Sequence, residues 1–136
     1  MTISFFIHST EDEDRLLSEI ENRFGLRPEE VSSERIMGHF GNEMISVKAH
    51  LVGNRAQEVA RIIVGALSRT AKNSIRAELE RSLDEHDSIY LRLDRQTLGE
   101  SSLSLSDEEP IRIKLKPKTR SGGRQSMEKQ YEELIK

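Results

Sequence analysis

The sequence contains no cysteine and no long apolar run. The lack of cysteine excludes a disulfide framework, a thiolate zinc site and a cysteine nucleophile. No stretch approaches the roughly 18 apolar residues that a membrane-spanning helix needs. The first residues, Met1 to Ser4, lack the basic region that precedes the apolar run of a secretory signal. We therefore expect a cytoplasmic protein with no membrane partner.

The length of 136 residues predicts one domain, residues 1–136, in which 121–136 form a basic loop and a short C-terminal helix. The net charge of −3 hides a strong segregation of charge. Residues 1–34 carry nine acids against three bases, and 84–110 carry eight against two. Residues 35–83 carry eight bases against four acids, and 111–136 carry eight against three. Overall acidity argues against indiscriminate polyanion binding, but the blocks permit a local basic surface.

The alternation of apolar and polar residues predicts strands that bury one face. Helical apolar stripes lie between them, with a capping box of Thr10 and Glu13 before the first and Asn54 as the cap of the second. This irregular interleaving favours an α+β fold, a mostly antiparallel sheet with helices packed on one face in two layers. The predicted strands are 2–8, 31–38, 44–52, 88–94 and 111–116, and the helices are 10–24, 54–67, 71–84 and a short one near the C-terminus.

The predicted strand at 111–116 alternates isoleucine or leucine with a cation, so Arg112, Lys114 and Lys116 should face solvent. The same alternation predicts a shared face of cations, aromatic rings and imidazoles. Such a face can hold single-stranded RNA, because bases stack on rings and cations neutralise phosphates. The alternative is that a two-layer domain always has one wet, charged face. The other residues expected there are Phe6, His8, Ser46, Lys48, His50, Tyr90 and Arg92.

A second candidate is the segment Gly38-His39-Phe40-Gly41-Asn42. Its glycines would let backbone N–H groups approach a phosphate, and His39 and Asn42 could contact a base or ribose. It is not a P-loop, because no Gly-Lys-Ser or Gly-Lys-Thr follows. The alternative is a hairpin turn that needs positive φ at glycine.

The sequence offers little for catalysis. None of the histidines is paired with another at helical spacing, and there is no His-Glu-x-x-His or Gly-x-Ser-x-Gly motif. The acidic clusters at 11–14 and 84–94 need no metal ion to explain them, because acids are common in a first helical turn and at a helix-to-strand turn. We expect no enzymatic activity, no metal and no cofactor.

Three stretches together resemble a known family. They are His8-Ser9-Thr10-Glu11-Asp12-Glu13, Gly38-His39-Phe40-Gly41-Asn42-Glu43 and Ile89-Tyr90-Leu91-Arg92-Leu93-Asp94-Arg95-Gln96. In this order and spacing they resemble an archaeal family of small proteins described as predicted exosome subunits or RNA-binding proteins, over nearly the whole chain. The resemblance implies a fold similar to the large-subunit ribosomal protein that binds 5S RNA, RNA binding alongside RNA-processing or translation machinery, and no catalytic residues. The family pattern has a small or basic residue where this chain has Phe40, which would suit stacking rather than phosphate contact.

The sequence therefore predicts an RNA-binding protein, with RNA and proteins of an RNA-processing complex as partners. The alternative is a protein-interaction subunit, or a homodimer joined through the open sheet face at Phe6 and Met44. The residues expected to bind RNA are Lys48, Tyr90, Arg92, Arg112, Lys114, Lys116, Lys118, Arg120, His39 and Asn42.

Overall fold

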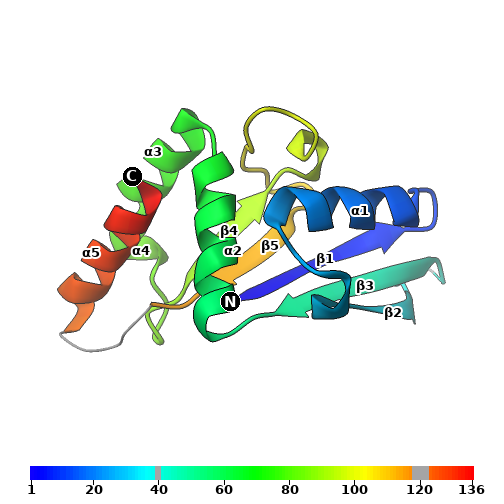
Figure 1. The fold of residues 1–136 in the computed structure, drawn as a ribbon, viewed down its shortest axis with the longest axis horizontal. Coiled ribbons are helices and arrows are strands. Elements are labelled where there is room, and N and C mark those ends of the chain that lie inside the picture. The colour runs from blue at the N-terminus through cyan, green and yellow to red at the C-terminus, as the bar shows by residue number, and fades with distance from the viewer. Residues whose placement is uncertain (39–40, 118–122) are drawn as a thin grey trace.

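A computed structural model describes residues 1–38, 41–117 and 123–136 (Figure 1). Five strands form one antiparallel sheet in the order β2-β3-β1-β5-β4. The α+β class and the antiparallel sheet predicted from the sequence are confirmed. The strands are β1 (Thr2–His8), β2 (Val31–Met37), β3 (Glu43–His50), β4 (Ile89–Leu93) and β5 (Ile111–Leu115).

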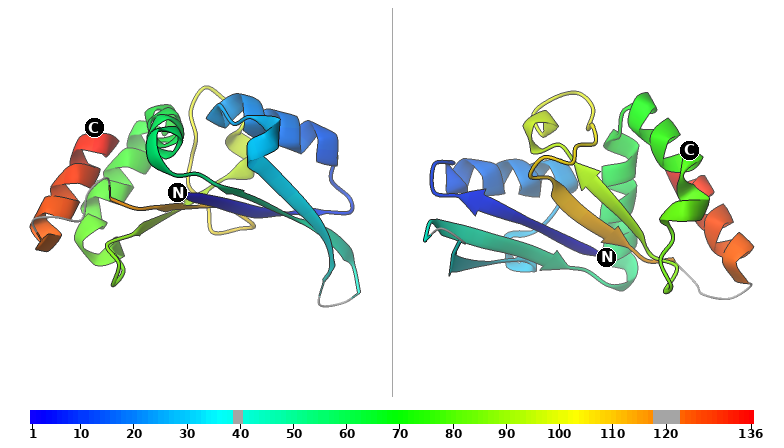
Figure 2. Two further views of the ribbon diagram at one scale, coloured as in Figure 1. Left: turned by 60° about the horizontal axis from the view of Figure 1, so that its bottom comes forward. Right: turned by 180° about the vertical axis from the view of Figure 1, so that it is seen from behind.

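The helices cover one face of this sheet, and the left view of Figure 2 shows α1, α2 and α5 on the same side of the strands. Among the described residues, no helix is both long enough and apolar enough to cross a membrane. The helices are α1 (Glu13–Phe24), α2 (Gly53–Ala66), α3 (Arg69–Ala77), α4 (Leu79–Ser82) and α5 (Gly123–Ile135), with short 3-10 helices η1 (Pro28–Glu30) and η2 (Arg95–Thr97).

The core lies between the sheet and these helices. Along β5, Ile111, Ile113 and Leu115 are buried while Arg112 is exposed, and β1 and β4 alternate in the same way. Each fully buried isoleucine or leucine contributes about 1.5–3 kcal/mol of transfer free energy. A one-residue slip of any strand would move this set into solvent, so the pattern fixes the register. The predicted parity of the strands is therefore confirmed.

The start of α1 differs from the prediction. The N-cap is Asp12, whose Oδ1 accepts a hydrogen bond from the Arg15 backbone N–H at 3.2 Å. Thr10 is not the cap because residues 8–11 form a turn, in which the Glu11 N–H donates to the His8 carbonyl at 2.9 Å. At the other end, Gly25 adopts a φ of 71° and ends the helix after Phe24, the last residue of the predicted range 10–24.

The other helix boundaries also differ from the predicted ones. Helix α2 starts one residue before Asn54, and its N-cap is Val52, which makes no side-chain capping bond. The helix expected at 71–84 begins earlier, because the Ser68 hydroxyl accepts from the Ala71 N–H at 3.0 Å, and it is interrupted at Glu78.

Gly38, Gly41 and Asn42 lie between β2 and β3, which pair along the whole length of β2. The Gly41 N–H donates to the Gly38 carbonyl at 3.0 Å, and Gly41 adopts a φ of 80°. The turn interpretation is therefore confirmed. His39 and Phe40 lie outside the described residues.

Candidate functional site

The strand register places several predicted cations in one row across the open face, which is the face of the sheet opposite the helices. Lys48 of β3 pairs with Ser4 of β1, Ser4 pairs with Arg112 of β5, and Arg112 pairs with Arg92 of β4. Directly paired residues lie on the same face of an antiparallel sheet, and neighbouring strands are about 4.8 Å apart. The basic row, Lys48, Arg112 and Arg92, therefore spans about 14 Å.

A second row lies beside it. His50, Thr2, Lys114 and Tyr90 are consecutive partners across the same four strands. The Lys114 ammonium lies 5.6 Å from the centroid of the Tyr90 ring, a cation–π distance. Tyr90 is 49% exposed, so part of its ring remains free for another contact.

The Tyr90 side chain is held in position by Asp84, the last residue before the turn that leads into β4. The Tyr90 hydroxyl donates to Asp84 Oδ2 at 3.2 Å, and the backbone N–H groups of Ser88 and His86 donate to Asp84 Oδ1 at 2.8 and 2.9 Å. These hydrogen bonds, led by that from Ser88, and the charge of Lys114 lower the pKa of Asp84. The carboxylate thus stays ionised and fixes the ring at the margin of the face.

Much of the positive charge on this face is uncompensated. Arg92 and Arg112 lie directly opposite each other, an arrangement that is unfavourable without an anion. Arg92 lies 3.7 Å from the exposed Asp107 carboxylate, whereas Lys48, Arg112 and Lys116 have no ion-pair partner among the described residues. Nearby, burial and the charges of Lys116 and Lys114 lower the pKa of the Met1 amino group. Positive charge therefore gathers at this end of the sheet.

The structure brings together five of the ten predicted residues, and Lys116 follows directly after β5. Asn42 is exposed at the opposite end of β3, six residues or about 20 Å along the chain from Lys48, so the hairpin turn does not join the basic row. Lys118, Arg120 and His39 lie outside the described residues. The five that share the open face are Lys48, Tyr90, Arg92, Arg112 and Lys114.

The rest of the open face is more apolar. His8, Met44 and Ile36 are paired across β1, β3 and β2, and Phe6 lies next to them with 37% of its surface exposed. Phe6 shares its row with the polar residues Ser46 and Glu34, which are its consecutive partners across β3 and β2. The open face thus has a basic half and a half without cations that contains Phe6, Met44 and Ile36, here called the apolar half, to which the residues of the dimer hypothesis belong.

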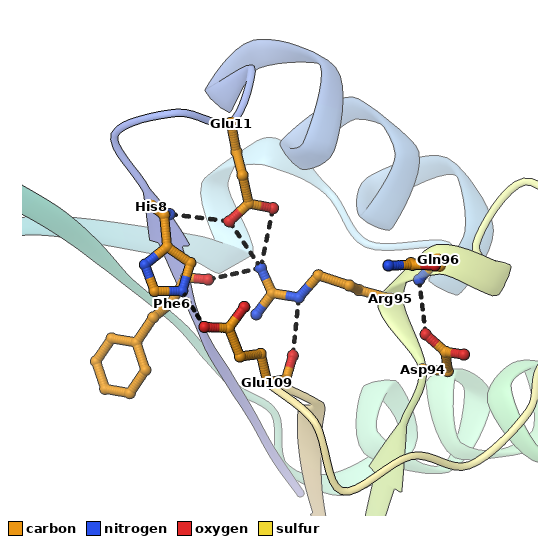
Figure 3. Close-up of polar contacts among 7 residues, drawn as sticks. All are labelled: Phe6, His8, Glu11, Asp94, Arg95, Gln96 and Glu109. Carbon is orange, nitrogen blue, oxygen red and sulfur yellow. Dashed lines mark hydrogen bonds and ion pairs between the residues drawn. The ribbon is translucent and has the colours of Figure 1, made fainter.

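A polar network centred on Arg95 lies at the end of the sheet where β1 ends (Figure 3). Arg95 Nη1 donates to the Phe6 carbonyl at 2.8 Å and to both carboxylate oxygens of Glu11, at 3.1 and 3.2 Å. Its Nε donates to the Glu109 carbonyl at 2.8 Å. His8 adds two contacts, because its N–H donates to Glu11 Oε1 at 2.9 Å and its Nε2 lies 2.7 Å from Glu109 Oε1.

The Arg95 network is a feature that sequence reasoning missed, since the acids at 11–14 were explained only as residues common in a first helical turn. The Arg95 side chain is 11% exposed, and its guanidinium lies 5.9 Å from the centroid of the core residue Phe5. A signal was present, because His8 and Glu11 belong to one family-like stretch and Arg95 to another. The network gives the stretches at 8–13 and 89–96 a structural role. Their side chains connect the end of β1, the residues before α1 and the loop before β5.

Among the described residues, no three His, Cys, Asp or Glu side chains are grouped so that they could hold a metal ion. The acidic cluster at 11–14 is instead divided between roles. Glu11 pairs with Arg95, and Asp12 caps α1.

Comparison with protein sequences finds a family described as RNA binding, whose model matches residues 1–117. RNA-binding protein PAB1135 from Pyrococcus abyssi is 31% identical over 126 residues, which are 85% of this chain and 79% of that protein. Uncharacterized protein MJ0213 from Methanocaldococcus jannaschii is 30% identical over 116 residues, or 78% and 76% of the two chains.

Comparison with solved structures finds the same fold in archaeal proteins. Protein AF2318 from Archaeglobus fulgidus, described as a DUF54 protein, superposes with a TM-score of 0.77 and 26% identity, covering 98% of this chain and 96% of its own. Protein SSO0741 from Sulfolobus solfataricus, also DUF54, gives a TM-score of 0.76 at 23% identity and covers 98% and 95% of the two chains. The latter likeness concerns the fold alone.

Proposed function

Because the chain belongs to the family described as RNA binding, we propose that RNA binds to the basic half of the open face. The observation that carries the proposal is the row of Lys48, Arg112 and Arg92, which the register aligns across four strands. An RNA backbone supplies the anions that this row lacks. Contacts to phosphates need only charge at a suitable spacing, so this mode of binding carries little sequence preference.

The proposed contacts divide by chemistry. Lysines and arginines neutralise phosphates, while the exposed part of the Tyr90 ring stacks on a base. Lys116 continues the positive charge beyond β5, and we propose the same role for Lys118 and Arg120. For His39 and Asn42 we propose contacts at a separate point, with a longer RNA that reaches the hairpin.

The role we propose is one of binding rather than catalysis, in an accessory factor of RNA processing or translation. The family description and the relative named as an RNA-binding protein support the binding part. The resemblance to predicted exosome subunits and to a ribosomal protein that binds 5S RNA supports the cellular context.

The experiment compares two triple variants that lower the net charge equally. The test variant is Lys48→Gln, Arg112→Gln, Lys114→Gln on the open face. The control is Arg61→Gln, Arg69→Gln, Arg76→Gln, three exposed positions on the helical layer. Affinity for a fluorescent oligo(U) 12-mer is measured by anisotropy across a salt series. A single-stranded ligand loses about 0.7 of log–log salt slope per phosphate contact, so the test variant should lose about 2 and the control nothing.

Equal slopes for wild type and the test variant would remove the open face from the site, and equal losses in both variants would show only a general charge effect. Light scattering of the same samples examines the dimer hypothesis. A wild-type mass of two chains that falls to one on Phe6→Ser or Met44→Ser would identify the apolar half as a subunit interface.

A further inference from the structure

We propose that the outer edge of β4 forms a pocket for one nucleobase of the RNA bound on the open face. This inference rests on the proposed function and specifies a part of the ligand that the basic row does not touch. Strand β4 is the last in the sheet, so its outer edge faces no neighbouring strand. Pairing at such an edge is available to a ligand that can donate and accept hydrogen bonds.

This edge is open at Tyr90 and at the N–H of Arg92. Beyond Arg92 it is covered, because Leu93 bridges Leu105, with the Ser106 N–H donating to the Arg92 carbonyl at 3.0 Å. Before Ile89 the chain turns back, and the Asp84 N–H donates to the Ser88 carbonyl at 3.0 Å.

Tyr90 lies between these two covered ends. Alternate residues of a strand direct both backbone groups to the same side. The Arg92 carbonyl points outward, so the N–H and C=O of Tyr90 point outward too. Over residues 1–38, 41–117 and 123–136, no backbone group is paired with them at this edge. The edge therefore presents the N–H and C=O of Tyr90 side by side, followed by the N–H of Arg92.

A cavity of about 530 Å³ lies against this edge, within the range of 300–1,000 Å³ that is typical of small-ligand sites. Helix α3 and the residues after it form one wall, and the segment that bridges Leu93 forms the other. The cavity is continuous with the basic row, because Arg92 belongs to both. Its lining includes apolar Ile75 and Leu105, hydroxyls of Ser74 and Ser82, and carboxylates of Glu78 and Asp107.

This combination fits a base better than a peptide strand. A peptide that extends a sheet gains affinity from hydrogen bonds to several residues of the edge, and among the described residues this edge offers only Tyr90 and the N–H of Arg92. Every nucleobase, in contrast, presents an adjacent donor and acceptor on its Watson–Crick edge. Ile75 and Leu105 can contact the faces of the ring, and the carboxylates of Glu78 and Asp107 can accept hydrogen bonds from an exocyclic amine. We therefore expect an amino-bearing base such as adenine.

The test fills the cavity from its α3 wall and leaves the basic row intact. Ser74→Trp and Ala77→Trp each place a large ring at an exposed lining position, and Asn73→Trp is the matched control, exposed on the same helix but outside the lining. Anisotropy is measured with an oligo(A) 12-mer and with an abasic 12-mer that keeps the ribose phosphates. The filled variants should bind oligo(A) about tenfold more weakly, with an unchanged salt slope and unchanged affinity for the abasic strand. Asn73→Trp should match wild type with both.

A second readout is independent of affinity for long RNA. In a ¹H–¹⁵N spectrum, adenosine monophosphate should shift the Tyr90 amide signal of wild type and not that of Ser74→Trp. Wild-type affinities for oligo(A) in both filled variants and an unmoved Tyr90 signal would overturn the pocket, while the salt-slope experiment above would still decide the basic row. A dimer mass that Ser74→Trp reduces, with oligo(A) affinity unchanged, would overturn the pocket as well and assign the edge to a second copy of the chain.

Discussion

The Arg95 network should stabilise the fold without contributing to RNA binding. Arg95→Met keeps an aliphatic stem of similar length and removes the ion pair with Glu11 and the hydrogen bonds to the carbonyls of Phe6 and Glu109. Glu11 is 29% exposed, so water can compensate its lost partner only in part. Hydrogen bonds of charged groups contribute about 1.5–3 kcal/mol each when buried. With water reaching the three acceptors to different extents, we expect a total loss of about 3 kcal/mol.

The expected loss of unfolding free energy can be converted into a change of melting temperature. Unfolding entropy is about 2.1 cal/mol/K per residue near 60 °C, or about 0.3 kcal/mol/K for a chain of this length. The melting temperature of Arg95→Met should therefore fall by about 10 °C in a circular-dichroism melt at neutral pH.

The control is Arg15→Met, which breaks an ion pair with Glu19 on the surface of α1, where the Arg15 side chain is 78% exposed. An exposed pair of this kind contributes at most about 0.5 kcal/mol, so the control should melt within about 2 °C of wild type. In a double-mutant cycle, Glu11→Gln should cost much less in the Arg95→Met background than in wild type. Similar melting temperatures for Arg95→Met and Arg15→Met, or additive effects of Glu11→Gln and Arg95→Met, would refute a cooperative network.

Two further predictions concern single side chains. Tyr90→Phe loses the hydroxyl bond to Asp84 but keeps the ring, so its affinity for oligo(U) should stay within about threefold of wild type. Tyr90→Ala should lower the affinity for oligo(U) about tenfold at constant salt slope. Equal affinities of the two variants would exclude stacking. A hydrogen bond from Arg55 lowers the pKa of Glu30 to about 2, so its stabilising contribution is complete above the ordinary pKa of 4.5 and disappears as the pH falls through about 2. The difference in unfolding free energy between wild type and Glu30→Gln, from urea titrations, should therefore shrink between pH 5 and pH 2, and a constant difference would contradict this assignment.

The sequence predicted the faces of the sheet well because burial acts on every second residue. Ile111 and Ile113 must share a side that Arg112 cannot, whatever the neighbours are, so the cations of β5 could be assigned to solvent in advance. Helix ends were harder. Thr10 and Asp12 are both good caps, and the turn that selects Asp12 depends on Glu11, whose partner is 84 positions away in the chain.

Strand order and the assembly of the basic row were beyond local patterns. The alternation around Lys48 is the same whether β3 lies next to β1 or at a far edge, and only the register shows that Ser4 alone separates Lys48 from Arg112. The pocket at β4 could not be predicted either. It depends on which residues of the outer β4 edge pair with the segment 103–106, and the local sequence does not specify that pairing. The predicted contacts at Lys118, Arg120 and His39 remain predictions.

The central place of β1 has a consequence for synthesis of the protein. Of the five strands in the described residues it is synthesised first, yet its two neighbours are β3 and β5, and the pairing with β5 joins residues 2–4 to residues 112–114. A nascent chain that lacks its last quarter would expose one side of β1 and leave β4 without its partner. Such unpaired edges are prone to aggregate, and pairings so distant in sequence form slowly. The order of strands therefore favours a sheet that forms only after β5 has been synthesised, and a product truncated before β5 would leave both β1 and β4 without that partner.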